Sequence, residues 1–363
     1  MKKKNLIFFL PDFICGGGGK SVTSLCRNLN KKKFQISIIC LNKCYYKNEL
    51  KSFSKIYEIP KKKALFAQSE IRKIIEKNVN ENEENIFISN LFYANALTAL
   101  FQKKYRNLKF VFTERTAFKE LSIYFGIKDF VKKFLIKLIL KFFYKKADLV
   151  IANSKKVASD ISNFSNVRTT YVYPGSFYKT FKRQKKVSRK LNIISIGRMS
   201  EEKGFDILVK AFRYIDKEKY NLNIIGDGNK KENIIDLVNK YQLQKNIKVL
   251  GFKANIYPYL KKSDLLINPS YFEGFPNVVI EALSCGVPVI CSKSYGGINE
   301  ILKNEKYGDL FENGNTKDLK NKISNFLKNP NKLQYKSLKG QKDLKRFSEK
   351  ESAKKYEKIF LTL

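Results

Sequence analysis

Residues 273–290 read EGFPNVVIEALSCGVPVI, and this stretch decides the fold that we predict. A buried strand ends near Pro269, the following loop carries Glu273, and a helix begins near Asn277. Gly286 ends that helix immediately before another apolar strand. The first amide groups of such a helix and the positive end of its dipole suit a polar or anionic ligand. The segment therefore predicts one unit of an α/β fold with a ligand at its loop.

The two acids of this stretch lie eight positions apart. Glu273 precedes the helix and Glu281 lies in its second turn, so the two carboxylates can contact different parts of one polar ligand. The alternative is that Glu281 is simply an exposed helix residue. The residues alone leave both interpretations open.

The same alternation of strand and helix extends over nearly the whole chain. We expect strands at 6–10, 35–41, 55–59, 86–90, 110–114, 148–153, 170–173, 191–196, 222–225, 247–251, 265–268, 287–291 and 309–311. Helices are expected at 21–29, 69–78, 130–144, 204–215, 230–241, 277–284 and 316–327. The strand runs are continuously apolar, which is typical of strands buried on both faces of a parallel sheet. The sequence therefore predicts an α/β protein with doubly wound parallel sheets.

Residues 176–190 interrupt this rhythm, because they contain many Lys and Arg residues and few apolar ones. We interpret them as a basic linker between a first domain, 1–175, and a second domain, 191–340. Residues 341–363 are expected to form a helix that returns to the first domain. Two Rossmann-like domains of similar size place the ligand in a cleft at the carboxyl ends of the strands.

The second domain opens with IGRMSEEKGFD at residues 196–206. A buried strand ends at Gly197 and a helix begins near Gly204, so Arg198 and Lys203 lie at the rim of the sheet. A guanidinium fork and a mobile ammonium group together suit a diphosphate. The alternative is that both side chains are simply solvated.

A run of glycines follows the first strand, in the sequence PDFICGGGGKS at residues 11–21. The phosphate-binding P-loop requires a further glycine where this chain has Ile14, so that motif is excluded. What remains is a strand, a glycine turn and a helix start, where Gly17 and Gly18 let a ligand approach the backbone. We expect an anionic oxygen there; the alternative is a flexible turn.

Composition narrows the possible chemistry further. The 363 residues contain 72 Lys and Arg, 33 Asp and Glu and no His, for a formal net charge of +39. The absence of His excludes Ser-His-Asp triads, Cys-His pairs and His-ligated metal sites. The 6 cysteines form no C-x-x-C pair and indicate buried thiols in a reducing compartment. The positive charge is consistent with a polyanionic partner, but it is spread over every segment, as compositional bias would produce.

The hydropathy pattern does not indicate a membrane span. The apolar run at 6–10 is too short for the core of a secretory signal, and no segment approaches about 18 uninterrupted apolar residues. We therefore expect a cytoplasmic protein.

Together these segments resemble the retaining GT-B glycosyltransferases of family 4, whose C-terminal domain is often called glycosyl transferase group 1. The resemblance covers essentially the whole chain and is most specific in residues 197–206, 226–228 and 270–300. The family's E-x7-E spacing is intact as Glu273 and Glu281. The glycine run resembles the family's usual GGAERV, with Gly and Lys in place of Ala and Glu.

The resemblance implies a GT-B fold, in which the first domain binds an acceptor and the second holds a nucleotide-diphosphate sugar. Arg198 and Lys203 would hold the diphosphate and stabilise charge on the leaving group. Glu281 would bind ribose hydroxyls and Glu273 the hydroxyls of the donor sugar. Catalysis is thereby assigned to Glu273, Arg198 and Lys203, and donor binding to Gly17, Gly18, Glu281, Phe275, Asn277, Val278 and Gly226.

The resemblance further implies transfer of a hexose or an N-acetylhexosamine with retention of anomeric configuration, without a metal ion or other cofactor. The expected role is synthesis of a cell-surface glycan such as lipopolysaccharide, on a saccharide or a lipid-linked saccharide acceptor. Alternatives are a phosphorylase or epimerase of the same fold and, less favoured, a basic nucleic-acid-binding protein. The last would leave the E-x7-E spacing unexplained, so no nucleic-acid partner is expected.

One position departs from the family pattern. Many members carry a histidine in the first-domain loop after the fifth strand, where this chain has FTERTAF at residues 112–118. Arg115 occupies the histidine position and Glu114 precedes it. We assign both to contacts with the sugar or the acceptor.

The segment 130–146 bears on where the acceptor lies. On a helix, Val131, Phe134, Leu135, Leu138, Ile139 and Phe142 cluster on one side, and Lys133, Lys137, Lys141 and Lys145 line the other. A basic amphipathic helix of this kind can lie on an anionic membrane, at the inner face of the cell membrane. The alternative is that the apolar side packs on the first-domain sheet while the lysines face water.

Overall fold

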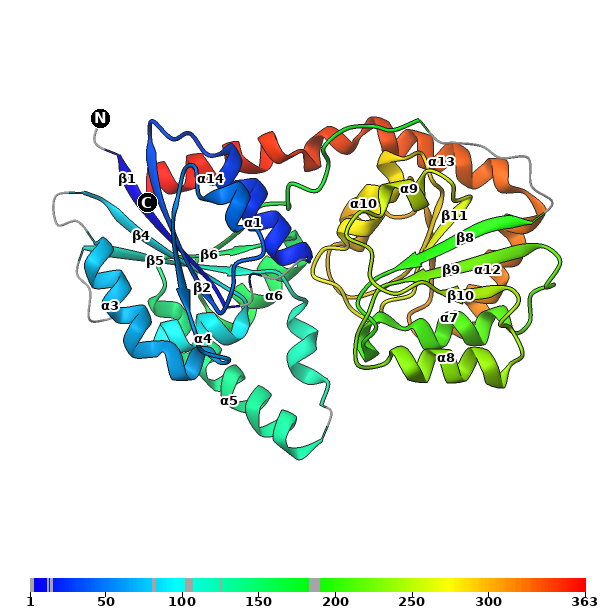
Figure 1. Ribbon diagram of the computed structural model, residues 1–363, viewed down its shortest axis with the longest axis horizontal. Helices are drawn as coiled ribbons and strands as arrows, with labels where there is room; N and C mark the ends of the chain where they lie inside the picture. The colour runs from blue at the N-terminus through cyan, green and yellow to red at the C-terminus, as the bar shows by residue number, and fades with distance from the viewer. Residues whose placement is uncertain are drawn as a thin grey trace. The chain divides into compact units, whose positions relative to one another are not determined.

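A computed structural model describes residues 3–11, 13, 16–79, 83–101, 107–124, 126–182 and 190–363. The chain divides into two compact units (Figure 1). Unit 1 contains residues 1–175 and 347–363, and unit 2 contains residues 176–346.

Unit 1 is built around seven parallel strands, in the order β3-β2-β1-β4-β5-β6-β7. The strands are β1 (Lys4–Leu10), β2 (Phe34–Leu41), β3 (Lys55–Ile59), β4 (Asn85–Asn90), β5 (Leu108–Glu114), β6 (Leu149–Ala152) and β7 (Thr169–Tyr171). The helices are α1 (Gly17–Asn28), α2 (Lys47–Leu50), α3 (Gln68–Asn78), α4 (Phe92–Phe101), α5 (Ile127–Phe143), α6 (Lys155–Ser165) and α14 (Glu349–Thr362). The 3-10 turns among the described residues of the unit are η1 (Ala64–Ala67), η3 (Phe118–Ser122) and η4 (Tyr144–Lys146).

The central strand β1 shows why the sheet is covered on both faces. Successive side chains of a strand point to opposite faces. Ile7 and Phe9 enter the core formed with α3 to α6, whereas Leu6 and Phe8 enter the core formed with α1, α2 and α14. A strand buried on both sides is apolar on both faces, as Leu6–Leu10 of β1 are.

Unit 2 repeats this design with six parallel strands, in the order β10-β9-β8-β11-β12-β13. The strands are β8 (Leu191–Ile196), β9 (Tyr220–Ile225), β10 (Ile247–Val249), β11 (Leu265–Asn268), β12 (Val289–Ser292) and β13 (Asp309–Phe311). The helices are α7 (Phe205–Phe212), α8 (Lys231–Lys240), α9 (Tyr257–Leu260), α10 (Asn277–Ser284), α11 (Ile298–Leu302), α12 (Thr316–Lys328) and α13 (Pro330–Lys342). The 3-10 turns are η5 (Glu201–Lys203) and η6 (Leu344–Phe347).

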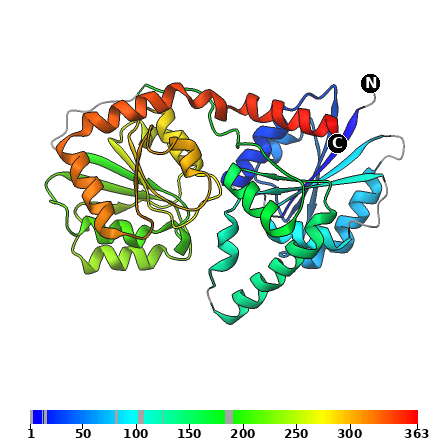
Figure 2. The same ribbon diagram turned by 180° about the vertical axis from the view of Figure 1, so that it is seen from behind.

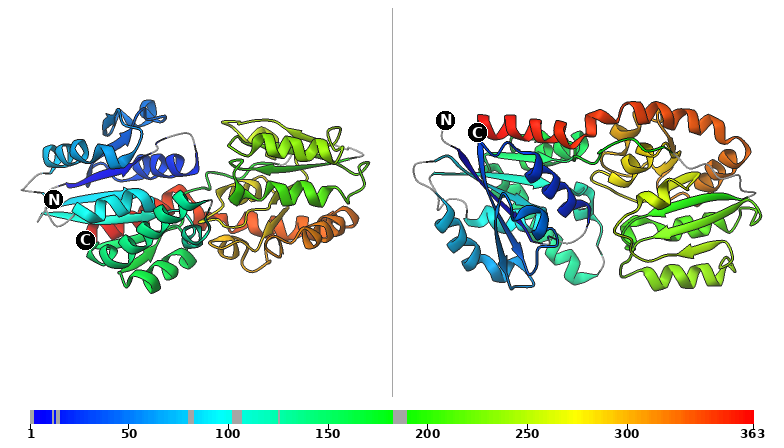
Figure 3. Two further views of the ribbon diagram at one scale, coloured as in Figure 1. Left: turned by 90° about the horizontal axis from the view of Figure 1, so that it is seen from below. Right: turned by 45° about the horizontal axis from the view of Figure 1, so that its top comes forward.

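The C-terminal helix α14 belongs to unit 1, where it lies beside α1 (Figure 3). It begins at Glu349, later than the expected 341, because α13 continues to Lys342 in unit 2. Glu349 accepts two hydrogen bonds from the Arg27 guanidinium of α1, at 3.0 and 3.1 Å. Phe360 packs edge-on against Phe8 and Phe34, so α14 seals one face of the first sheet.

The first part of the expected linker packs on unit 2. The backbone N–H of Phe181 donates to the carbonyl of Ser284 at 2.8 Å, and the Phe181 ring lies 4.6 Å from that of Tyr257. The remaining linker residues, 183–189, lie outside the described residues.

Helix α5 turns its apolar stripe toward solvent and not toward the sheet. Its buried side chains are Lys133, Ile136 and Leu140, whereas Phe134 and Phe142 are about half exposed. The expectation that the apolar side packs on the sheet while the lysines face water is therefore wrong. Lys133 reaches the interior because Asp129 and a backbone carbonyl receive its ammonium group.

Two further sequence expectations concern cysteines and membrane spans. Cys26, Cys40, Cys44, Cys285 and Cys291 are free and buried, and Cys15 lies outside the described residues. Among the helices that the structure describes, none combines the length and the apolar character required to cross a bilayer.

Candidate functional site

The predicted site residues of unit 2 lie at one edge of its sheet, beyond the carboxyl ends of three neighbouring strands. Strand β8 lies between β9 and β11, and all three run in parallel. The loop after β8 carries Arg198 and Lys203, the loop after β9 carries Gly226, and the loop after β11 carries Glu273. Parallel strands end at the same edge, so these loops meet there.

An ion pair joins two of these loops. The Nζ atom of Lys203 lies 2.6 Å from Oε1 of Glu273, and the two side chains are only 20% and 13% exposed. The hydroxyl of Ser270 donates to the same Oε1 atom at 3.0 Å. Partial burial reduces screening by water, so this pair is stronger than an exposed one. Both contacts use Oε1, which leaves Oε2 as the Glu273 atom suited to a ligand hydroxyl.

The Glu273 loop is held in place by a pair of glycines after β12. The N–H of Glu273 donates to the carbonyl of Tyr295 at 2.8 Å, and the N–H of Gly297 donates to the carbonyl of Gly274 at 2.9 Å. Gly296 has a φ of +119°, and a Cβ there would lie 1.5 Å from the carbonyl oxygen of Glu273. A side chain at Gly296 would therefore displace the backbone that carries Glu273.

Phe275 is part of this packing. Its ring is 6% exposed, and a Cβ at Gly297 would come within 2.4 Å of it. Sequence reasoning assigned no role to Gly296, Gly297 or Ser270. The available signals were the adjacent glycines directly after a strand and a serine three positions before Glu273.

Helix α10 positions Asn277, Val278 and Glu281. Asn277 is its first residue and accepts a 2.6 Å hydrogen bond from the hydroxyl of Ser176 at Oδ1. The residue before the helix, Pro276, provides no side-chain cap, and the first turn begins with the half-buried Asn277 and Val278. Glu281 is 7% exposed, so the expectation of a merely exposed helix residue is wrong.

Arg198 is the most accessible of the predicted cations, with 73% of its side chain exposed. Its Nη2 atom lies 2.8 Å from Oε1 of Glu202, which also accepts a 2.5 Å hydrogen bond from Ser200. Burial raises the pKa of Glu202, but the hydrogen bonds from Ser200 and Arg198 outweigh it and lower that pKa below its ordinary value. Glu202 was missed at the sequence level, although it lies one helical turn after Arg198.

Gly226 packs directly against the start of the Arg198 loop. Its φ is +149°, and a Cβ there would lie 1.8 Å from the carbonyl oxygen of Gly197. The N–H of Gly197 in turn donates to the carbonyl of Ile225 at 3.0 Å. Gly226 thus allows two loops of the site to touch, and its contact with a donor stays a prediction.

In unit 1, Gly17 and Gly18 form the first turn of α1. Gly17 is exposed and Gly18 is half-buried, and no side chain of the described residues caps this helix start. A Cβ at Gly18 would meet no atom within 4 Å. The protein itself therefore does not require glycine at Gly18, and the predicted anion contact stays a prediction.

Glu114 requires a correction. It ends β5 with no solvent exposure, and its Oε1 atom accepts hydrogen bonds from Tyr144 at 2.5 Å and Asn95 at 2.7 Å. Oε2 is buried, and no described residue forms a hydrogen bond with it. Burial raises the pKa of this carboxyl group to about 8, although both hydrogen bonds lower it. Glu114 is therefore a core residue whose burial favours the protonated form, and in this structure it offers no surface for the expected contact with a sugar or an acceptor.

Arg115, the next residue, is half-buried. Its Nε atom donates to Oδ1 of Asn90 at 3.3 Å, and its carbonyl accepts a 2.7 Å hydrogen bond from Asn153. These contacts hold Arg115 at the carboxyl edge of the first sheet, since Asn90 ends β4 and Asn153 follows β6. Its role with the sugar or the acceptor stays a prediction.

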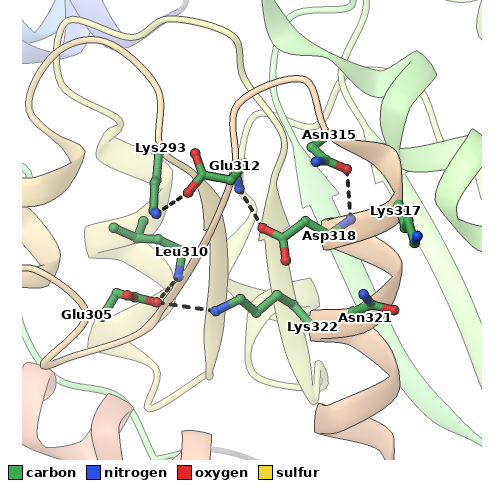
Figure 4. Close-up of a pocket in the computed structure, with 9 residues that line it drawn as sticks. All are labelled: Lys293, Glu305, Leu310, Glu312, Asn315, Lys317, Asp318, Asn321 and Lys322. Carbon is green, nitrogen blue, oxygen red and sulfur yellow. Dashed lines mark hydrogen bonds and ion pairs between the residues drawn. The ribbon is translucent and has the colours of Figure 1, made fainter.

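A pocket of about 460 Å³ lies elsewhere in unit 2, between β13 and the start of α12 (Figure 4). Its charged side chains pair with one another: Lys293 with Glu312, and Lys322 with Glu305 at 3.5 Å. The residues lining it include none of those predicted from the sequence. We therefore place the site at the loops after β8, β9 and β11 instead.

The described residues contain no group of three or more Asp, Glu or Cys side chains placed to hold a metal ion. The positive groups of the site are Arg198, Lys203 and the start of α10. An arrangement of this kind binds and stabilises negative charge.

Two protein families match consecutive parts of the chain. Residues 15–175 match the family described as Glycosyltransferase Family 4, and residues 177–343 match Glycosyl transferases group 1. Their boundary falls at the division between the two units.

Similarity to individual proteins agrees with these family matches. The chain is 27% identical over 321 residues to the N-acetylgalactosamine-N,N'-diacetylbacillosaminyl-diphospho-undecaprenol 4-alpha-N-acetylgalactosaminyltransferase of Campylobacter jejuni, covering 82% of this chain and 83% of that protein. It is 30% identical over 291 residues to an uncharacterized glycosyltransferase of Methanocaldococcus jannaschii, covering 74% and 72%. The crystal structure of Anabaena HepE in complex with UDP and glucose superposes with a TM-score of 0.79 at 18% identity, covering 99% and 100%. The chain therefore belongs to the glycosyltransferases and has the GT-B fold, with its group 1 match in residues 177–343.

Proposed function

We propose that this enzyme moves a hexose or an N-acetylhexosamine from a nucleotide-diphosphate sugar to a saccharide or lipid-linked saccharide, with retention of configuration and without a metal ion. The observation that carries the proposal is the Lys203–Glu273 ion pair at the edge of the second sheet. In this pair, a cation that suits a phosphate lies within hydrogen-bond distance of a carboxylate that suits a sugar hydroxyl.

The donor's diphosphate is assigned to Arg198 and Lys203. Both cations are paired with carboxylates, Glu202 and Glu273, in a protein without ligand. A diphosphate brings more negative charge than either carboxylate, so it can recruit both ammonium and guanidinium groups. The uncapped first turn of α10 adds backbone donors at Asn277 and Val278.

The sugar and ribose hydroxyls are assigned to the two glutamates. Glu273 is restrained by Lys203 and Ser270 at Oε1, so Oε2 can accept from a donor-sugar hydroxyl in a fixed position. Glu281, buried in α10, is assigned to the ribose. A carboxylate held by an ammonium group is a weak nucleophile, which favours a positioning role for Glu273 over covalent catalysis.

The transfer step balances without a protein base. The bond between the anomeric carbon and the leaving phosphate oxygen breaks as the acceptor oxygen bonds to the same face of that carbon. The departing phosphate oxygen takes the acceptor's proton. Lys203 and Arg198 stabilise the negative charge that develops on this oxygen, which is the part played by a metal ion in other transferases.

The names of two similar proteins support our proposals for the acceptor and for the location in the cell. The Campylobacter relative is named for a diphospho-undecaprenol substrate, and HepE was crystallised with UDP. These names support a uridine-type donor, a lipid-linked acceptor and a role in cell-surface glycan synthesis. They also favour a position at the inner face of the cell membrane.

The test is a screen of uridine, guanosine and adenosine diphosphate sugars for slow donor hydrolysis and for transfer to lipid-linked saccharides. We expect one nucleotide class to support turnover that is unchanged by excess EDTA, with the product's anomeric configuration retained. Loss of activity with EDTA would contradict metal independence, and an inverted product would contradict retention. No turnover with any donor would overturn the proposal.

A further inference from the structure

Helix α5 presents a broad apolar face to solvent. Six of its large apolar residues are between 38% and 52% exposed: Phe130, Val131, Phe134, Leu135, Leu138 and Phe142. At 100° per residue they occupy an arc of about 140° on one side of the helix. The helix stands out from the rest of unit 1 (Figure 2), so this face is not covered by the sheet.

The opposite side of α5 fixes this orientation. Ile136 and Leu140 enter the core of unit 1, and Lys133, on the same side of the helix, is 4% exposed. Its ammonium group lies 2.8 Å from Oδ2 of Asp129 and donates to the carbonyl of Ile123 at 2.7 Å. Turning α5 to bury its apolar face would expose Ile136 and Leu140 and would break these contacts.

Lysines border the apolar face on both sides. By the same helical geometry, Lys128 and Lys132 lie along one border, and Lys137 and Lys141 along the other. The single acid of α5 is Asp129, which is turned inward toward Lys133. The exposed surface of α5 therefore combines apolar and positively charged groups, and its one carboxylate is paired with Lys133.

We propose that this face of α5 docks on an anionic membrane. The apolar side chains would enter the boundary between headgroups and acyl chains, while the bordering lysines reach lipid phosphates with their apolar stems against the bilayer. A second copy of the chain fits this surface poorly, because it would bring the same lysines and a net charge of +39 to the contact. The inference stands on α5 alone and does not rest on the transferase reaction.

The chain contains no tryptophan, so a single introduced one reports on its own surroundings. The full-length F134W variant would be mixed with vesicles of phosphatidylethanolamine and phosphatidylglycerol in equal amounts. We expect a blue shift of its emission and quenching by brominated acyl chains. The control is Y335W on α13, where Tyr335 is 62% exposed in unit 2, and its emission should not change.

A binding measurement tests the same face without a reporter. Flotation with these vesicles should show affinity at least about tenfold weaker for F134Q/L138Q/F142Q. The matched control Y214Q/Y335Q/L338Q removes three exposed apolar side chains from unit 2 and should bind normally. K141Q/K145Q should weaken binding to anionic vesicles and reduce its dependence on salt. Circular dichroism and thermal unfolding would verify that every variant is folded.

Three results would overturn the proposal. One is an F134W emission that does not respond to anionic vesicles. Another is equal loss of binding in the two triple variants, which would indicate nonspecific attraction of a basic protein. The third is an F134W blue shift that depends on protein concentration without vesicles, which would make this face a contact between copies of the chain.

Discussion

The extent of burial distinguishes the glutamates near the two sheets from one another, whereas their positions in the sequence do not. Glu114, Glu273 and Glu281 all lie near the carboxyl edge of a sheet, but only Glu114 is closed off from solvent with an unpartnered oxygen. Its neighbours Asn95 and Tyr144 come from α4 and from the turn after α5, respectively. No local sequence pattern predicts these contacts, so the burial of Glu114 could not be foreseen.

Glu114 should make stability depend on pH. Its folded pKa of about 8 lies above the ordinary value of 4.5, so between these pH values the folded state holds a proton that the unfolded state has lost. Stability attributable to this group is therefore greatest below pH 4.5 and declines as the pH rises toward 8. We expect the free energy of unfolding of E114Q to fall by roughly 3–5 kcal/mol less than that of the wild type over this pH range. Urea unfolding at several pH values measures the difference.

The control for this titration is E232Q, at an exposed position of α8. It should leave the pH dependence of the free energy of unfolding as it is in the wild type. Equal slopes for E114Q and the wild type would show that Glu114 is ionised in the folded protein.

Among the elements of the site, the glycine turn after β12 should be the least tolerant of change. G296A would place a Cβ 1.5 Å from the Glu273 carbonyl at a φ of +119°. We expect a loss of roughly 2–4 kcal/mol in the free energy of unfolding, with a fall in kcat because the Glu273 loop must move. Thermal unfolding and donor turnover measure the two effects.

Gly251 offers a matched comparison, since it has a φ of +69° but no atom lies within 4 Å of where its Cβ would be. G251A should cost only about 1–2 kcal/mol, from backbone conformation alone. If both substitutions cost the same, steric contact with the Glu273 loop is not the reason for glycine at Gly296.

The strands were predictable as elements because each is a short apolar run bounded by polar turns. β3, β8, β11 and β13 begin and end where the sequence analysis placed them, and so does α10. Helix α5 shows the limit of this reasoning. A hydrophobic stripe normally faces the core, but here Ile136, Leu140 and a paired Lys133 provide the inner contact instead. Amphipathicity located the helix, but only tertiary packing determines which side is inside.

The parts of the site that could be predicted were those carried by contiguous motifs. Arg198, Lys203 and Glu273 were recognised because each follows a strand in a short, distinctive segment. The partners Ser270 and Glu202 lie within four residues of Glu273 and Arg198, but the sequence does not show that their side chains form hydrogen bonds. Gly296 acts through contact between two loops, which becomes visible only in the folded protein.

At the scale of the whole molecule, the C-terminal helix completes a unit that begins at the other end of the chain. Phe360 is buried between Phe8 and Phe34, and Glu349 pairs with Arg27. We expect F360A to destabilise unit 1 by about 3–5 kcal/mol. Limited proteolysis should then release a protected fragment from unit 2. K358A, at an exposed position of α14, should have little effect, and equal sensitivity of both units to F360A would contradict this assignment.

The central claim is that unit 2 holds a nucleotide-diphosphate sugar through Lys203, Glu273 and Glu281. Calorimetric binding of the active donor to the wild type, K203M and E281Q tests it most directly. The control is K210M, which removes another lysine in a 2.8 Å ion pair, on the exposed side of α7. We predict binding at least about tenfold weaker for K203M and E281Q and unchanged for K210M. Wild-type affinity in K203M and E281Q would contradict the claim.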